Sequence, residues 1–299
     1  MVGVLFVIVA CVLWAVDTLF RYPLLKLGEQ AEFIVFAEHL LLVFCCLPIL
    51  YRARQKILET KLSNILHFLA IGGFGSAIGT LAFTKAFTLI NPSLVILLQK
   101  LQPLVAIFLA RIYLKEPLRR QYFFWAGLCL VGGLMISFKD LWPGANGLSF
   151  DSDMASVDSI IGYSLALLAV VSWGSSTVFG KKLSTDGYSE KEIMSGRFLM
   201  GMICLTPVVM SGELEWQWAP EFWSKIFVMV VLSGLLGMYF YYQGLKRLPA
   251  RLCALAEMFF PFCAIGVNWV FLGATLDSTQ LLGGGLLLIG STVIQIKHY

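Results

Sequence analysis

Residues 98–106, LQKLQPLVA, return 158 positions later as residues 256–264, AEMFFPFCA, and this repetition decides the fold. Each stretch places a polar side chain four residues before a proline. The matching positions are Gln99 with Glu257, and Pro103 with Pro261. Because a proline removes the backbone hydrogen bond to the residue four earlier, both stretches are predicted to bend there and to free a carbonyl group beside the polar residue. The two prolines are therefore candidate hinges.

The match continues over most of the chain. The pairs are Gly79 with Gly237, Gly127 with Gly285 and Gly132 with Gly290 at an offset of 158, and Trp14 with Trp173 and Gly28 with Gly187 at an offset of 159. Gly79 and Gly237 each end a small-x-x-x-small pattern, which favours close helix packing and makes them further hinge candidates. A duplication of about half the chain is predicted.

The composition indicates a membrane protein. Of the 299 residues, 59% are hydrophobic and 13% are charged, whereas a soluble domain carries about 25% charged residues. Most of the surface must therefore face lipid. The net charge of +4 does not indicate a nucleic-acid partner, because the basic residues lie in short loops between apolar runs. The seven cysteines form no C-x-x-C pattern, so neither a metal site nor a cofactor is predicted.

Ten apolar windows are long enough to cross a bilayer. They lie near residues 2–20, 32–51, 64–82, 91–110, 121–138, 160–179, 190–210, 224–243, 250–272 and 279–296. The predicted fold is an all-α membrane protein of ten transmembrane helices, arranged as two inverted five-helix repeats. Residues 1–138 form the first repeat, 139–159 the linker and 160–299 the second repeat.

The distribution of basic residues predicts the orientation. With a cytoplasmic N-terminus, fifteen Lys and Arg residues fall in cytoplasmic segments and five on the opposite side. Those five are Arg21, Lys26, Lys85, Lys139 and Lys225. Since positive residues favour cytoplasmic loops, both termini are predicted to lie in the cytoplasm, in a multi-pass protein of the cell inner membrane. Five spans per half turn the second half upside down, so that one shared site can face either side in turn.

Several short motifs resemble one transporter family. They are Trp14-Ala15 with Trp173-Gly174, Lys85-Ala86-Phe87 with Gln243-Gly244-Leu245, and Pro103 followed by Lys115-Glu116-Pro117-Leu118. Their order in two registers resembles the EamA family of the drug/metabolite transporter superfamily. The resemblance implies ten helices, cytoplasmic termini, and export or exchange of small metabolites by alternating access. Ala274 departs from the pattern at the place of Glu116, as do Gln102 and Phe260 before the prolines.

Charged side chains inside the spans suggest where a substrate binds. Such a charge costs about 2.5–3.5 kcal/mol on insertion scales, so it is expected to face a cavity or a partner. Lys100 and Glu257 lie at equivalent depths in two spans, and Gln99 and Gln102 share an arc with Lys100. These four residues are predicted to bind substrate. Alternatively, the glutamines only bridge helices.

Lys100 and Glu257 are predicted to form an ion pair with two uses. A zwitterionic substrate could insert between them, with its carboxylate on Lys100 and its amine on Glu257. Alternatively, Glu257 alone could take up a coupling proton, because a carboxylate is costly to ionise in apolar surroundings.

Asp17 and Glu38 form a second acidic group and are further candidates for proton coupling. Asp17 has Ser176 at its place in the other half. It could instead reach the membrane interface or pair with Arg21. Arg197, which stands at the place of His39 in the other half, is expected to have a structural role in an ion pair or at the interface.

Aromatic side chains make up 14% of the chain. Trp14, Trp173 and Tyr239 are predicted to bind substrate. The residues that could line a pocket for an amphipathic or aromatic metabolite are Phe259, Phe260 and Phe262 near Glu257, with Tyr239, Tyr241 and Tyr242 in the eighth span. The alternative, that most of the aromatic residues face lipid, stays open.

The favoured function is secondary transport of a small metabolite, with an amino acid or a similar amphipathic compound first. A multidrug exporter of hydrophobic cations is the second choice, and a membrane receptor or assembly protein the third. No Walker, H-E-x-x-H or G-x-S-x-G motif is present, so neither ATP-driven transport nor an enzyme is predicted. The expected partners are a small-molecule substrate, the lipid bilayer and a coupling proton. The sequence is compatible with a homodimer as well as with a monomer.

Overall fold

The structure is a computed structural model. It describes residues 2–113, 115, 120–141, 157–211, 219–248, 253, 256–257, 259–273 and 276–297. The regular elements of these residues are all helical. Most of the expected linker 139–159, the start of the ninth expected span, and Ala274, Glu116, Pro117 and Leu118 lie outside the described residues.

The first half of the chain contains five helical rods. They are α1 (Val2–Lys26), α2 (Ala31–Arg52), the rod of α4 (Leu62–Leu69), η1 (Ala70–Ile78) and α5 (Gly79–Leu89), the rod of α6 (Pro92–Leu98), η2 (Gln99–Leu101) and α7 (Gln102–Tyr113), and α8 (Gln121–Leu141). The short helix α3 (Arg54–Leu58) follows α2. The breaks within the rods are changes of helix type, because η1 is a π-helix and η2 a 3₁₀ turn.

The second half follows the same plan. It contains α9 (Val157–Thr185), α10 (Glu190–Ser211), the rod of α11 (Pro220–Met229), η4 (Val230–Gly237) and α12 (Met238–Arg247), then α14 (Phe259–Leu272) and α15 (Ser278–Lys297). The π-helix η4 stands where η1 stands in the first half.

The expectation of an all-helical membrane protein is confirmed. Seven helical segments among the described residues are long and apolar enough to cross a membrane. Three shorter apolar helices, within Gln121–Ile136, Cys263–Leu272 and Ser278–Gly290, match the other expected spans. The count of ten crossings stays a prediction. One expectation is wrong, because Arg21, placed in an outer loop, lies buried inside α1, which runs on to Lys26.

Local sequence explains several helix ends. Gly28 and Gly187, which match in the two halves, both have positive φ, of 89° and 90°. That conformation favours glycine and ends a helix by turning the chain back on its last carbonyls. Asn91 caps α6, since its side chain accepts a hydrogen bond from the backbone N–H of Ser93, and Pro92 occupies the first turn. The 3₁₀ turn η2 lies directly before Pro103, as expected for a proline-disturbed helix.

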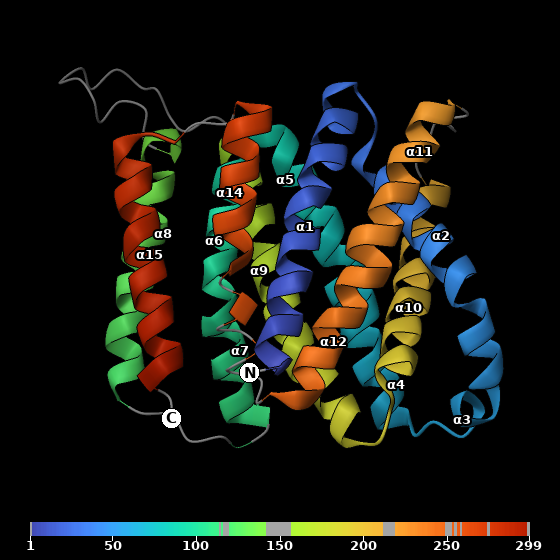
Figure 1. The fold of residues 1–299 in the computed structure, drawn as a ribbon. Helices are drawn as coiled ribbons and strands as arrows, with labels where there is room; N and C mark the ends of the chain where they lie inside the picture. The colour runs from blue at the N-terminus through green and yellow to red at the C-terminus, as the bar shows by residue number, and fades with distance from the viewer. Residues whose placement is uncertain are drawn as a thin grey trace.

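The helices of the two halves interlock. α1 packs on η4 and α12 of the second half, while α9 packs on η1 and α5 of the first. α8 and α15 pack against each other at one edge of the bundle (Figure 1). The start of α1 and the end of α15 lie at the same end of the bundle (Figure 1).

A reciprocal contact fixes this interlocking. A Cβ on Gly237 would lie 2.7 Å from Nε1 of Trp14, and a Cβ on Gly79 would lie 2.9 Å from Nε1 of Trp173. Each tryptophan of a half's first helix thus occupies a slot that a glycine in the other half leaves open. The role of these glycines as hinges stays a prediction, but they are needed for the close approach.

Gly75 allows a test of this packing. A Cβ on Gly75 would lie 1.7 Å from Oγ and 3.0 Å from Cβ of Ser176. We expect Gly75→Ala to destabilise the protein by about 1–3 kcal/mol, seen as a lower thermal midpoint in detergent. Adding Ser176→Gly should restore part of the loss.

Gly127 is the matched control. It lies in α8, and a Cβ there would meet nothing within 4 Å. Gly127→Ala should leave the midpoint unchanged or raise it, because alanine favours helix. Equal midpoints for Gly75→Ala and Gly127→Ala would contradict this account of the packing.

Candidate functional site

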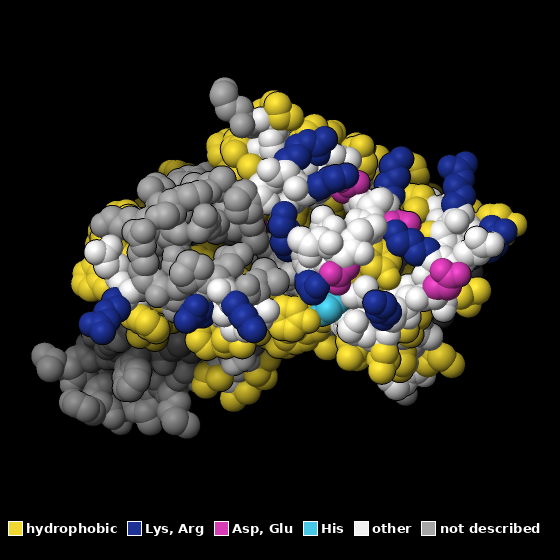
Figure 2. Space-filling model, turned by 90° about the horizontal axis from the view of Figure 1, so that it is seen from below, with side chains coloured by type: hydrophobic (Ala, Val, Ile, Leu, Met, Phe, Trp, Pro, Cys, Tyr) yellow, Lys and Arg dark blue, Asp and Glu magenta, His cyan; other side chains and the backbone are white. Residues whose placement is uncertain are grey.

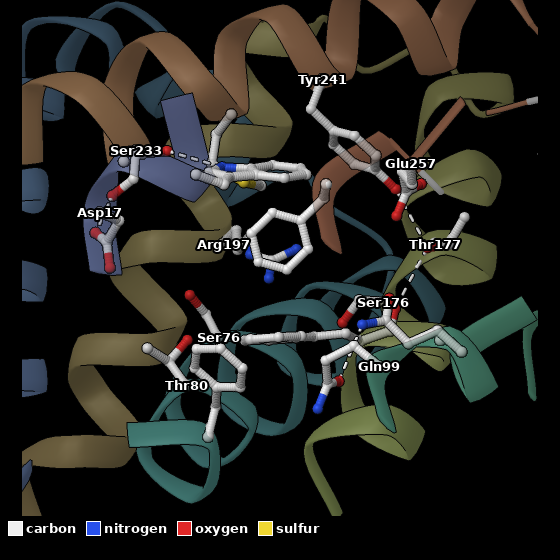
Figure 3. A pocket seen from close by; sticks show the side chains of 18 of the residues that line it. Asp17, Ser76, Thr80, Gln99, Ser176, Thr177, Arg197, Ser233, Tyr241 and Glu257 are labelled. Carbon is white, nitrogen blue, oxygen red and sulfur yellow. Dashed lines mark hydrogen bonds between the residues drawn. The ribbon is translucent and has the colours of Figure 1, made fainter. Parts of the chain in front are cut away.

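A cavity lies between the two halves. Its volume is about 1380 Å³, open space toward its mouth included. Both halves contribute to its wall, through α1, α2, η1, α5, η2 and α7 on one side and α9, α10, η4, α12, Glu257 and α14 on the other. The polar lining residues labelled in Figure 3 surround the space from several directions. An apolar pocket with a few converging polar groups is typical of a small-molecule binding site.

Two aromatic pairs at equivalent positions stand in the wall. Trp14 packs on Tyr241 with ring centroids 5.5 Å apart, and Trp173 packs on Phe83 at 4.9 Å, both with a tilt of 50°. Phe260 adds an edge contact to Trp14 at 6.5 Å. Each pair joins the first helix of one half to the third helix of the other. The cavity therefore offers two flat apolar surfaces to an aromatic ligand.

Lys100 and Glu257 meet in this wall. Lys100 is 3% exposed, and its Nζ donates to the main-chain carbonyl of Glu257 at 3.4 Å. Oε1 of the Glu257 carboxylate has no hydrogen-bond partner among the described residues. Thr177 and Tyr241 share a further hydrogen bond of 3.2 Å. The structure thus brings the two predicted residues into contact, while their predicted ion pair stays a prediction.

The glutamines of the proline stretch form a small network. Nε2 of Gln99 donates to the carbonyls of Val95 at 3.2 Å and Ala166 at 3.3 Å. Gln102 then donates to Oε1 of Gln99 at 3.0 Å. Gln99 therefore bridges the halves, as the alternative interpretation expected, and both glutamines also line the cavity beside Pro103.

A buried charge cluster borders the cavity. Arg21 donates from Nε to Asp17 at 2.7 Å and from Nη1 and Nη2 to Glu38 at 2.8 and 2.7 Å. Thr84 accepts a further hydrogen bond from Arg21 at 3.1 Å. Ser233 of the second half donates to Asp17 at 2.6 Å, so the cluster spans both halves (Figure 3). Two carboxylates share one guanidinium, which leaves an excess negative charge when both are ionised.

His39 and Arg197, at equivalent positions, have different surroundings. The His39 ring bonds through Nδ1 to the carbonyl of Val35 at 2.8 Å and through Nε2 to Oγ of Ser76 at 3.0 Å. Arg197 is buried and lines the cavity, yet its Nε has no hydrogen-bond partner in the part of the chain that the structure describes. Among the described residues no carboxylate lies within ion-pair distance of it. The expected structural ion pair of Arg197 is thus not found there.

Comparison with known proteins agrees with this architecture. The model of the EamA-like transporter family matches residues 1–138 and 160–296. The chain belongs to the EamA-like transporter family. It is also similar to the riboflavin transporter ImpX of Fusobacterium nucleatum subsp. nucleatum, with 32% identity over 304 residues that cover 99% of this chain and 97% of the relative. A protein of known crystal structure has a TM-score of 0.63 at 19% identity, covering 98% of this chain and 95% of its own, which supports the fold alone.

Within this EamA-like transporter, most of the predicted site residues line one cavity. They are Trp14, Asp17, Glu38, Gln99, Lys100, Gln102, Pro103, Trp173 and Glu257. Among the described residues of α12 the lining includes Tyr241 rather than Tyr239. Pro261 lies in α14, and its side chain is outside the described residues. Gly79 and Gly237 lie behind the indoles of the cavity wall.

Other lining residues of the EamA-like transporter were not singled out as site residues in the sequence. Thr177 and Ser233 are small polar residues, which are common inside membrane helices as packing residues. Tyr241, one of the aromatic residues that the sequence offers as pocket lining, stands at the place of Phe83 in the other half, and this offset of 158 favours it over Tyr239. Arg21 is four residues after Asp17, a spacing that places both on one helix face and could have shown that it is an inner residue.

The charge cluster gives a prediction for stability. Arg21→Met leaves Asp17 and Glu38 buried without their cation, and breaking a buried pair in this way costs about 3–5 kcal/mol. We expect a large fall in thermal midpoint and in the yield of monodisperse protein. Glu38→Gln in the same chain should recover part of the loss, because it removes one of the two unpaired charges. The exposed Arg54→Met is the control, and an equal effect there would contradict the role of Arg21.

Proposed function

We propose that the protein is a secondary transporter for a flat, uncharged aromatic metabolite that carries hydroxyl groups, with riboflavin as the first candidate. The observation that carries this proposal is the pair of aromatic surfaces, Trp14–Tyr241 and Trp173–Phe83, in one cavity. Such surfaces suit the tricyclic ring of a flavin. The riboflavin transporter from F. nucleatum, similar over nearly the whole chain, supports the same substrate class.

The polar groups of the cavity support an uncharged substrate. Three carboxylates, of Asp17, Glu38 and Glu257, and three cations, Arg21, Lys100 and Arg197, line it beside the imidazole of His39. Their formal charges cancel, so a strongly charged substrate gains no overall attraction. Hydroxyl and amide groups also line the cavity, where a sugar-alcohol chain such as that of riboflavin would lie against them. They belong to Ser76, Thr80, Gln99, Gln102, Ser176 and Thr177.

A second candidate substrate is compatible with the same cavity. An amino acid would use the contact of Lys100 with Glu257, inserting its carboxylate and amine between them. A hydrophobic cation is favoured less, because a cavity with balanced charges lacks the excess of acid that would hold it. Direct competition between riboflavin and amino acids in one assay separates these choices.

Alternating access follows from the inverted arrangement that we propose for residues 1–138 and 160–299. Moving one half against the other would expose the shared cavity to each side in turn. We propose that both termini lie on the cytoplasmic side of the cell inner membrane. Figure 2 looks onto the end of the bundle that holds both chain ends, and Lys and Arg side chains outnumber Asp and Glu there. That bias is typical of a cytoplasmic face.

Coupling to protons is proposed for two places. The cluster of Asp17, Arg21 and Glu38 has one more acid than base, so it can hold a proton without losing its ion pair. Its bond to Ser233 of the other half would change with protonation of Asp17. Glu257 is the second place, because one of its oxygens is buried beside the substrate space and has no hydrogen-bond partner among the described residues.

Transport in liposomes tests the function. The purified protein should give saturable uptake of radiolabelled riboflavin and counter-flow from preloaded vesicles, whereas a channel shows neither property. Trp14→Ala and Trp173→Ala should each lower the apparent affinity at least about tenfold, because each removes one aromatic surface. Trp269→Ala, on a side chain that is 65% exposed, is the matched control and should transport normally. Uptake of amino acids with no effect of riboflavin would overturn the proposal.

Coupling is tested at Glu257. Glu257→Gln keeps the shape of the side chain but cannot release a proton, so we expect uptake that no longer responds to a pH gradient. Expression and riboflavin exchange without a gradient should persist. Gradient-driven uptake by this variant at the wild-type rate would show that the coupling group is elsewhere.

A further inference from the structure

Arg197 is a buried cation that makes no ion pair among the described residues, although Glu257 lines the same cavity close enough to interact with its charge. It lies in α10, is 8% exposed, and occupies the middle of the cavity view in Figure 3. Arg21, by contrast, binds both Asp17 and Glu38. A buried charge without a partner is costly, and in a membrane span such a charge generally faces a cavity with a functional role. A ligand that enters the cavity can therefore supply the hydrogen-bond partner that the Arg197 side chain lacks.

The residue at the equivalent position in the other half, His39, already has its hydrogen-bond partners within the protein. His39 has both ring nitrogens hydrogen-bonded, to Val35 and Ser76. The two halves thus present different chemistry at matching places. One has a ring with both nitrogens hydrogen-bonded, and the other has a guanidinium whose Nε lacks a partner among the described residues. A substrate bound in the cavity would place its polar edge toward Arg197.

The backbone that carries Arg197 is held in place. The Arg197 carbonyl lies 2.5 Å from where a Cβ of Gly72 would be, so α10 and η1 are in direct backbone contact. Four residues on, a Cβ of Gly201 would lie 2.8 Å from Nε2 of His39. The edge of Phe198 packs on His39, with centroids 6.3 Å apart. Contacts of this kind fix the helix and leave the long side chain to meet a ligand.

We infer that Arg197 binds the carbonyl edge of the flavin ring and so sets the orientation of the substrate. The inference rests on the proposed function. A guanidinium presents two parallel N–H donors in a plane. A flavin carries two matching acceptor pairs, each a ring nitrogen beside a carbonyl, namely N1 with O2 and N5 with O4. Arginine reads the same arrangement in guanine, where it binds N7 and O6.

The rest of the cavity agrees with this orientation. The aromatic pairs can flank the ring system. Gln99 and Thr177 come from other elements, η2 and α9, and line the same cavity, where the hydroxylated chain would lie. Arg197 thereby acts as a binding and specificity-determining residue that discriminates flavins from aromatic compounds without an acceptor pair.

Binding to the full-length protein in nanodiscs tests the inference. Quenching of riboflavin fluorescence gives the Kd. Arg197→Gln should raise the Kd about 10- to 100-fold, as expected for loss of a bidentate contact. Arg197→Lys keeps the charge but loses the fork, and should also weaken binding. Arg54→Gln, at an exposed site, is the control and should bind as the wild type does.

Analogues of riboflavin locate the contact. 1-Deazariboflavin lacks N1 and 5-deazariboflavin lacks N5, so one of them should bind the wild-type protein more weakly than riboflavin. That penalty should vanish in Arg197→Gln. The inference is overturned if the variant binds riboflavin like the wild type, or if the penalty is the same in both proteins. Tighter binding of flavin mononucleotide than of riboflavin, lost in the variant, would instead identify Arg197 as a phosphate-binding residue and overturn it too.

Stability without ligand provides an independent readout. Arg197→Met removes the unpaired charge, so we expect the empty protein to have a higher thermal midpoint, while riboflavin stabilises it less than the wild type. A lower midpoint would show a structural ion pair and overturn the inference. Failure of the wild-type protein itself to bind riboflavin would overturn the proposed function and this inference together, whereas failure confined to the variants concerns Arg197 alone.

Discussion

The rest of the structure depends on the contact of an indole with a glycine across the two halves. Trp14 lies against Gly237 and Trp173 against Gly79. Lipid gives helices no hydrophobic reason to associate, so close backbone approach and van der Waals contact must hold the halves together. The same indoles form the wall of the cavity. The same two tryptophans therefore pack the halves together and form the surface offered to substrate.

Much of the fold follows from the sequence, because the bilayer restricts the choices. A chain with few charges and long apolar runs must form helices in lipid, and repeated glycines such as Gly28 and Gly187 mark where those helices end. Helix ends were harder to place. The run of α1 past residue 20 looked too polar for a span, since Arg21 is charged. Its partners Asp17 and Glu38 come from two helices, and tertiary pairing of this kind is not visible in hydropathy.

The sequence likewise predicts one part of the candidate site and not another. Residues placed by the repeat, such as Trp14, Trp173 and Lys100, line the cavity, because a shared axis puts matching positions around a common space. The repeat offset does not predict which side chains hydrogen-bond to each other. Ser233 reaches Asp17 across the halves, while at the equivalent crossing Gly75 meets Ser176. One crossing holds an ionisable hydrogen bond and the other only close contact, so the difference arises from single residues on a symmetric scaffold.

The balance of three acids and three bases around the cavity has an electrical consequence. Moving one elementary charge through a membrane potential of 100 mV changes its energy by about 2.3 kcal/mol. A carrier whose moving wall has no net charge, loaded with a neutral solute, does no work against that potential. Its turnover without a coupled ion should then be indifferent to voltage, so a current measured during flux would report the proton that we propose moves with the solute.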